Sequence, residues 1–264
     1  MNHLFRVFLS LLALVILLGF TMGCGKPAEG KLTNPILIKD GNGKVRNFNL
    51  YLPKGGGEGR PLLVYFHGVR SEKFKTMPVL KGYTGSPVDE TGLIPFCNTR
   101  GIVLLEMLPS YSYRNLNVEA HGWSPFEKET GGIETCIDSV IKEYEIDVDQ
   151  IYLAGISAGA VMCNHLANRR PEIYRGIISH SQAHISERDD VLDPVKTDRP
   201  FRVVICYTKG DYQNLKDICE KSYVKYRDHG YSVTLIRDLP PKSHKWSNSS
   251  NGRLWRLLTR PGTD

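Results

Sequence analysis

The stretch 151–166 constrains the fold of this chain more than any other part. Its apolar residues 151–154 run into the turn sequence G-I-S-A-G at 155–159, after which apolar residues recur at helical spacing. A strand that reverses sharply into a helix needs glycine where bulky side chains would clash, and glycine stands at both ends of this turn. The turn also presents Ser157 at a helix N-terminus, where free N–H groups favour negative charge. The flanking patterns distinguish it from an ordinary glycine-bounded turn and make Ser157 a candidate nucleophile.

Apolar runs elsewhere predict the remainder of a sheet. Residues 61–66 are continuously apolar, as in a strand covered on both faces, whereas 47–52 alternate like an edge hairpin strand. Apolar stripes at helical spacing cover 133–144 and 215–226. Further strands are expected at 102–105, 176–179, 201–207 and 232–236. This alternation predicts one α/β domain with a mostly parallel sheet and helices on both faces.

A serine hydroxyl becomes a good nucleophile when a base removes its proton and a buried acid orients that base. Asp211 follows the predicted strand 201–207, and His244 follows the predicted strand 232–236. The order Ser157, Asp211, His244 is the one that the α/β-hydrolase fold uses. The sequence therefore predicts this fold, with these three residues as a catalytic triad.

The sequence also offers other candidates for the acid and the base of the triad. Asp217, within a predicted helix, and Asp238, at a strand end, are alternative acids. His180 and His184 are alternative bases, but both precede Asp211 and would break the expected order. His244 is therefore preferred over them.

An acyl-transfer site also needs two N–H donors for the developing oxyanion. One comes from the residue after the nucleophile and one from the loop after the first central strand, which here are Ala158 and Val69. His67, in the same loop, is interpreted as a structural histidine that braces the turn.

Two long segments, 69–92 and 109–130, follow central strands and are expected to be irregular. Ligands bind at the carboxyl edge of open α/β sheets, so these segments would form walls of a substrate site. Trp123 lies in the second of them. It either lines the acyl or alcohol pocket, the role assigned to it here, or anchors the core under a long loop.

The N-terminus has the pattern of an export signal. Basic residues precede the apolar run 7–20, and small residues then lead to Cys24. An uncleaved membrane anchor is the alternative interpretation. We expect a signal peptide over 1–23, a tether over 24–34 and a hydrolase domain over 35–264, in an exported protein.

Composition argues against nucleic-acid binding and against a metal site. The formal net charge of +6 is modest, and the basic residues form no dense cluster interleaved with aromatic residues. Both observations argue against nucleic-acid binding. Of the six cysteines, five follow Cys24, and most of these fall in apolar patterns that favour packing roles. No Cys/His spacing suggests zinc, so neither a metal nor a cofactor is expected.

Several motifs together resemble secreted α/β-hydrolases of the polyhydroxybutyrate depolymerase and feruloyl or acetylxylan esterase group. The similarity covers nearly all of the chain after the signal and is carried by 63–68, Trp123, 146–152, 155–159, 170–172 and 244–246. It implies serine esterase activity on an extracellular ester, with Ser157, Asp211 and His244 in the matching positions. The end of the signal resembles a bacterial lipobox, which implies lipidation of Cys24 and attachment to a membrane.

The leading hypothesis is thus a secreted or lipid-anchored carboxylic-ester hydrolase that acts on polysaccharide-linked or polyester substrates through an acyl-enzyme. A prolyl-oligopeptidase-like serine peptidase is the first alternative. The second is a non-catalytic envelope protein that binds sugar or polymer in a hydrolase cleft. The oligomeric state stays open.

Overall fold

The computed structural model describes seven ranges of the chain. The predicted signal peptide, Cys24, the predicted tether and His184 lie outside them. Within these ranges, none of the helices combines the length and apolar character needed to cross a membrane. The ranges are 36–39, 45–71, 87–108, 111–115, 118–123, 126–183 and 192–260.

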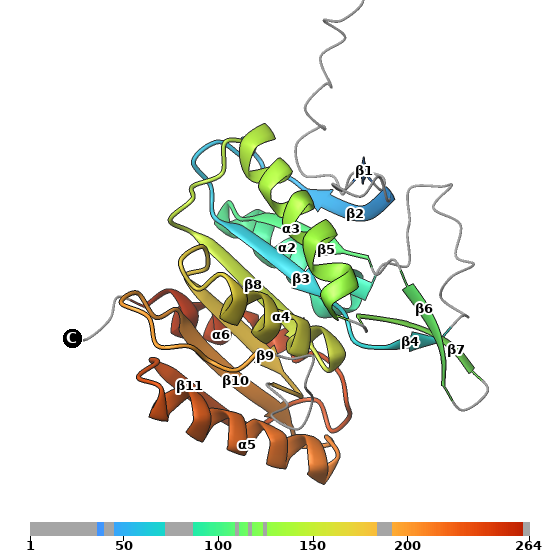
Figure 1. Ribbon diagram of the computed structural model, residues 1–264, viewed down its shortest axis with the longest axis vertical. Helices are drawn as coiled ribbons and strands as arrows, with labels where there is room; N and C mark the ends of the chain where they lie inside the picture. The colour runs from blue at the N-terminus through green and yellow to red at the C-terminus, as the bar shows by residue number, and fades with distance from the viewer. Residues whose placement is uncertain are drawn as a thin grey trace, which may run out of the picture.

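The main sheet has eight strands in the order β1-β2-β5-β3-β8-β9-β10-β11 (Figure 1). The pairs β1–β2 and β2–β5 are antiparallel, and every other neighbouring pair is parallel. The strands are β1 (Ile36–Lys39), β2 (Val45–Tyr51), β3 (Leu62–Phe66), β5 (Val103–Met107), β8 (Ile151–Ile156), β9 (Gly176–His180), β10 (Arg202–Thr208) and β11 (Val233–Leu239). The predicted α/β-hydrolase sheet is confirmed. The run 47–52, predicted as an edge strand, lies inside the sheet because β1 pairs with its outer side.

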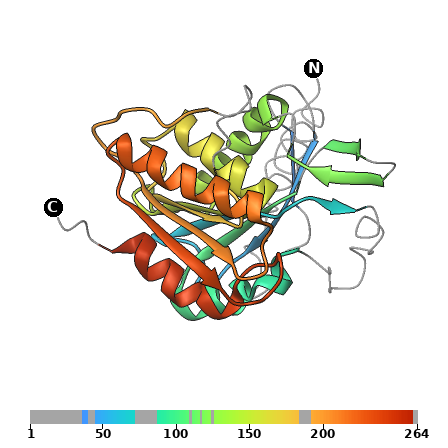
Figure 2. The same cartoon turned by 90° about the horizontal axis from the view of Figure 1, so that it is seen from below.

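Helices cover both faces of this sheet, as predicted. One face carries α3 (Phe126–Glu143), α4 (Ala158–Arg169) and α5 (Gln213–Asp228), and the other carries α2 (Leu93–Arg100) and α6 (Asn251–Thr259) (Figure 2). Each face has its own apolar core. Strand β3 is buried at every residue because it packs against both cores, which explains its continuously apolar sequence.

A second, three-stranded sheet projects beside the layered body (Figures 1 and 2). It pairs β4 (Arg70–Ser71) with β7 (Val118–Gly122), and β7 with β6 (Tyr111–Asn115), all antiparallel. The expectation that 69–92 and 109–130 are irregular throughout was therefore wrong. These strands are short and carry no continuous apolar run, so their sequence gives little strand signal.

Five cysteines lie within the described ranges, and all five are buried and unbridged. Three belong to the core under α3–α5 and two to the core on the opposite face. Their positions agree with the packing roles that the sequence favours. The residues are Cys97, Cys136, Cys163, Cys206 and Cys219.

Parallel pairing brings the ends of distant segments to one edge. Strands β3, β8, β9, β10 and β11 run side by side in the same direction, so the residues that follow them share the carboxyl edge of the sheet. Ser157 follows β8, Asp211 follows β10 and His244 follows β11. The fold thus assembles a site from segments far apart in the chain.

Candidate active site

The turn between β8 and α4 has the geometry of a strained nucleophile elbow. Ser157 adopts φ 54° and ψ −126°, a backbone conformation that side-chain-bearing residues rarely adopt. A Cβ atom on Gly155 would lie 2.3 Å from the Gly159 carbonyl oxygen, and one on Gly159 would lie 2.1 Å from the Phe66 carbonyl oxygen. Both glycines are required because the helix start, the strand end and the neighbouring β3 approach so closely.

Because of this crowding, we expect Gly159→Ala to destabilise the folded protein. We expect the free energy of unfolding to fall by about 3 kcal/mol or more, because the new methyl group overlaps backbone that cannot rotate away. A matched control is Gly131→Ala in α3, where an added Cβ has open space around it. That change should raise the stability by about 1 kcal/mol. Urea unfolding followed by circular dichroism measures both, and equal effects would contradict this account of the elbow.

Asp211 and His244 form the pair that the sequence predicts. The Nδ1–H of His244 donates to Oδ1 of Asp211 at 2.6 Å. Oδ2 of the same carboxylate accepts the Ser181 hydroxyl at 2.7 Å and the Thr208 backbone N–H at 2.6 Å. With Nδ1 engaged in this way, Nε2 of His244 is the nitrogen left to accept a proton.

Burial and hydrogen bonding act in opposite directions on Asp211. Desolvation raises the pKa of this carboxyl, but hydrogen bonds from His244, Ser181 and Thr208 outweigh it and hold the pKa below its usual value. Its side chain is fully buried, whereas that of His244 is 29% exposed. A buried carboxylate therefore supports a histidine that reaches the surface of a pocket.

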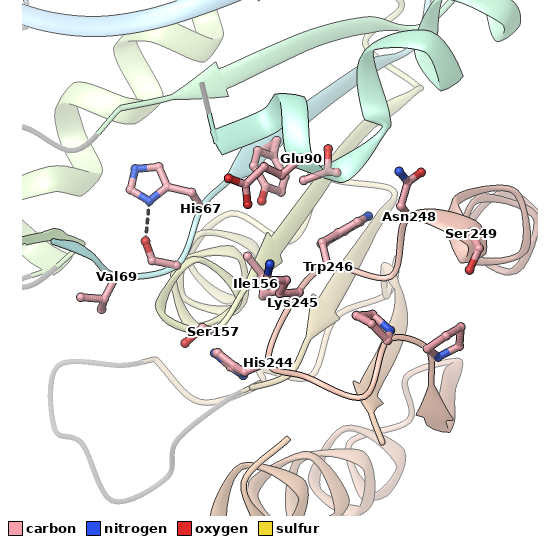
Figure 3. Close-up of a pocket in the computed structure, with 15 residues that line it drawn as sticks. His67, Val69, Glu90, Ile156, Ser157, His244, Lys245, Trp246, Asn248 and Ser249 are labelled. Carbon is pink, nitrogen blue, oxygen red and sulfur yellow. Dashed lines mark hydrogen bonds between the residues drawn. The ribbon is translucent and has the colours of Figure 1, made fainter. Parts of the chain in front are cut away.

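Ser157 and His244 line the same pocket of about 1020 Å³ (Figure 3). The apolar residues Tyr65, Ile156 and Trp246 form part of its wall. Polar side chains line it farther along, among them Glu90, Asn248 and Ser249. The pocket thus places apolar and polar side chains together around the serine and the histidine.

The alternative acids and the remaining described alternative base have other partners. Asp217 accepts a hydrogen bond from Gln213, and Asp238 lies 3.9 Å from the ammonium group of Lys216. His180 is fully buried and does not line the pocket. His180 meets Ser157 through its backbone, since its carbonyl oxygen accepts the Ser157 N–H at 2.9 Å. Asp211 is the acid that the structure joins to His244.

The loop after β3 presses against the elbow. Gly68 lies so close that a Cβ on it would be 3.2 Å from the Cβ of Ser157. Of the two expected oxyanion donors, Val69 is half-exposed and lines the same pocket as Ser157, and Ala158 is the first residue of α4. His67 is buried, and its Nδ1–H donates to the Gly68 carbonyl oxygen at 2.5 Å, in keeping with a bracing role.

Trp123 is not one of the described residues that line the pocket. This corrects the substrate-binding role expected for it. It is 1% exposed and packs edge-on against Phe66, with ring centroids 5.2 Å apart. Its indole N–H donates to the His67 carbonyl oxygen at 2.7 Å. Trp123 is a core anchor that holds the loop after β3 in place.

Sequence reasoning missed Ser181 and Thr208, the two residues that donate to Oδ2 of Asp211. Neither belongs to a motif, although Ser181 comes two residues after the predicted strand 176–179 and could have been considered with the other strand ends. Within the described part of the chain, histidine, cysteine and carboxylate groups form no cluster of three that could hold a metal ion.

One family model matches the part of the chain that holds the elbow. The family model described as the prolyl oligopeptidase family matches residues 129–191, which include β8, the elbow, α4 and β9. The comparison with curated proteins found no match. The matching family model describes a family of serine peptidases. This supports the expectation that the chain is a serine hydrolase.

Three solved structures illustrate the shared fold. A thermostable esterase is 17% identical with a TM-score of 0.55; the match covers 86% of this chain and 62% of that one. FphF, a fluorophosphonate-binding serine hydrolase of Staphylococcus aureus, is 12% identical with a TM-score of 0.55, over 87% and 100% of the two chains. A hyperthermophilic esterase from the archaeon Pyrobaculum calidifontis is 16% identical with a TM-score of 0.55, over 79% and 76%. The fold is that of the α/β-hydrolases.

Proposed function

We propose that this protein is a serine carboxylic-ester hydrolase that uses Ser157, His244 and Asp211 as its triad. The observation that carries the proposal is the joint placement of a strained serine and a histidine, itself bonded to a buried carboxylate, around one pocket. Strain of this kind persists in folded proteins mainly at functional sites.

The chemistry follows from the arrangement. Nε2 of His244 takes the hydroxyl proton as Oγ of Ser157 bonds to the ester carbonyl carbon, and the Ala158 and Val69 N–H groups stabilise the oxyanion. The C–O bond to the alcohol then breaks as His244 returns the proton to the leaving oxygen. A water, deprotonated by the same histidine, finally attacks the acyl carbon, and the bond to Oγ of Ser157 breaks as His244 returns the proton to that oxygen. Asp211 stays ionised and stabilises the imidazolium in both steps.

The pocket supports esters of hydroxylated or polymeric alcohols as substrates. Its apolar lining residues suit an acyl group, while Glu90, Asn248 and Ser249 offer hydrogen bonds to a hydroxyl-rich leaving group. Together with the resemblance to polyester and polysaccharide esterases, this favours polymer-linked esters outside the cytoplasm. We propose that lipidation of Cys24 anchors the enzyme outside the cytoplasm. A mass measurement of the mature N-terminus would detect the added lipid.

A serine peptidase is the second candidate, because the matching family model describes prolyl oligopeptidases and the same triad can cleave amides. Ester hydrolysis is preferred because several of the similar structures are themselves named esterases. A protein that only binds its ligand would gain nothing from the strained serine or from the buried carboxylate behind His244.

A fluorophosphonate probe, followed by ester and peptide substrate panels, tests these three functions. We expect covalent labelling that disappears in Ser157→Ala, turnover of short-chain p-nitrophenyl esters and no cleavage of peptides. Labelling with peptide cleavage alone would establish the peptidase instead. A folded wild-type protein that takes no label would leave only the binding function.

A further inference from the structure

A second line of hydrogen bonds reaches Asp211 from the side away from His244. The Ser181 hydroxyl donates to Oδ2 of Asp211 at 2.7 Å, and the Ser181 oxygen lies 2.7 Å from Nδ1 of His180. Nε2 of His180 accepts the Ser247 backbone N–H at 3.0 Å. All the side chains in this line are buried.

The direction of each bond is determined. A backbone N–H can only donate, so Nε2 of His180 carries no proton and Nδ1 of the neutral ring carries it. Complete burial lowers the pKa of His180 to about 3, with the charge on His244 acting in the same direction and Asp211 opposing it, so the ring is neutral at physiological pH. Nδ1–H therefore donates to the Ser181 oxygen, which leaves the hydroxyl hydrogen of Ser181 to point at Asp211.

Ser181 is held in place by its backbone as well. It adopts φ 57°, and its N–H donates to the Cys206 carbonyl oxygen at 2.7 Å, which ties it to β10, the strand that leads into Asp211. A residue other than glycine at positive φ is uncommon. The conformation points the hydroxyl toward the carboxylate and not along the strand.

His180 also contacts the segment that carries His244. Its ring stacks on Trp246 with centroids 4.9 Å apart and an interplanar angle of 24°. Trp246 and Ser247 follow His244 closely in the chain, so His180 anchors the loop of the base while it orients Ser181 against the acid.

We propose that Ser181 and His180 are positioning residues of the triad: His180 directs the Ser181 hydroxyl to Oδ2 of Asp211, which turns Oδ1 toward His244. This inference rests on the proposed function, because it assigns the two residues a part in the same reaction. Neither residue touches the substrate, and each acts through Asp211 or through the loop that carries His244.

Other titratable groups near Asp211 do not replace this role. The thiols of Cys206 on β10 and Cys219 on α5 interact with the carboxylate, but burial raises the pKa of both, so they stay neutral. The hydrogen bonds from His244, Ser181 and Thr208 are thus the means by which the described structure stabilises the charge on Asp211.

Two substitutions of Ser181 test the proposal. Ser181→Ala and Ser181→Gly both remove the hydroxyl, but only glycine suits the positive φ, so the glycine variant separates lost activity from lost stability. We expect kcat to fall about 10- to 100-fold in both, with KM little changed, because a hydrogen bond to a charged group is lost. The acid limb of kcat/KM should move to higher pH, because the Ser181 hydrogen bond is one of those that lower the pKa of Asp211 and its loss raises that pKa.

A pair of His180 variants provides the second measurement. His180→Phe keeps an aromatic ring against Trp246 but can neither donate nor accept, whereas His180→Gln has an amide that can do both. We expect the phenylalanine variant to lose activity as the Ser181 variants do and the glutamine variant to retain most of it. Ser250→Ala is the matched control, because it removes a buried hydroxyl bonded to that of Ser247 and should leave kcat and the pH profile unchanged.

The outcomes separate this inference from the proposed function. If wild-type protein is labelled by fluorophosphonate at Ser157, yet both Ser181 variants keep its kcat and acid limb, the inference is overturned and the proposed function stands. If the wild type shows neither labelling nor turnover, the proposed function itself fails. Should the Ser181 variants not fold, equal activity of His180→Phe and His180→Gln would overturn the inference by itself.

Discussion

Replacing Ser157 with alanine is expected to lower kcat for short-chain esters about 10⁶-fold, to the level supplied by substrate binding and the oxyanion donors alone. Ser157 is placed to form the covalent bond, and its removal leaves His244 without a hydroxyl to activate. Steady-state hydrolysis of p-nitrophenyl acetate and butyrate measures the loss. Because alanine can occupy the same strained backbone conformation as serine, the folded structure should persist.

The control for this prediction is Ser139→Ala on α3, whose hydroxyl bonds only within its own helix in the described hydrogen-bond network. It should retain wild-type kinetics. Ser157→Gly adds a further test, since relief of the positive φ should raise stability by about 1 kcal/mol without restoring activity. Substantial ester turnover by either Ser157 variant would show that another group is the nucleophile.

Asp211→Asn should lower kcat about 10⁴-fold, for a reason specific to this site. Ser181 and Thr208 both donate to Oδ2, so the amide oxygen of asparagine will occupy that position and its NH₂ group will face His244. Nδ1 of His244 must then accept, which moves the ring proton to Nε2, the nitrogen that faces the serine. A protonated Nε2 cannot accept the hydroxyl proton.

The matched controls for Asp211 are the two acids that the sequence offered as alternatives. Asp217→Asn and Asp238→Asn change exposed carboxylates that the structure joins to Gln213 and Lys216, so both variants should keep wild-type kinetics. Burst and steady-state phases with p-nitrophenyl esters report acylation and deacylation separately, and Asp211→Asn should slow both. A larger loss in either control than in Asp211→Asn would reassign the acid.

The central strands β3, β5, β8, β9 and β10 could be predicted because they are buried on both faces and therefore read as continuous apolar runs. The three residues proposed as the triad could be named because each lies in the segment that follows a predicted strand. Ser181 escaped notice because its importance lies in the direction of one hydroxyl, which no spacing encodes. Trp123 illustrates the same limit: its sequence context fits a pocket wall and a core anchor equally, and the packing against Phe66 decides.

The sheet order has a consequence for how activity fails. Strand β11 is the last in the sheet and pairs on one side only among the described strands, yet it leads into the loop that carries His244. Edge strands have fewer partners and open at lower free energy than central ones. Ser157 instead follows β8, a central strand that pairs with a neighbour on each side. The proposed nucleophile therefore follows a central strand and the proposed base follows an edge strand. Local unfolding of that edge would abolish activity while most of the molecule stays folded.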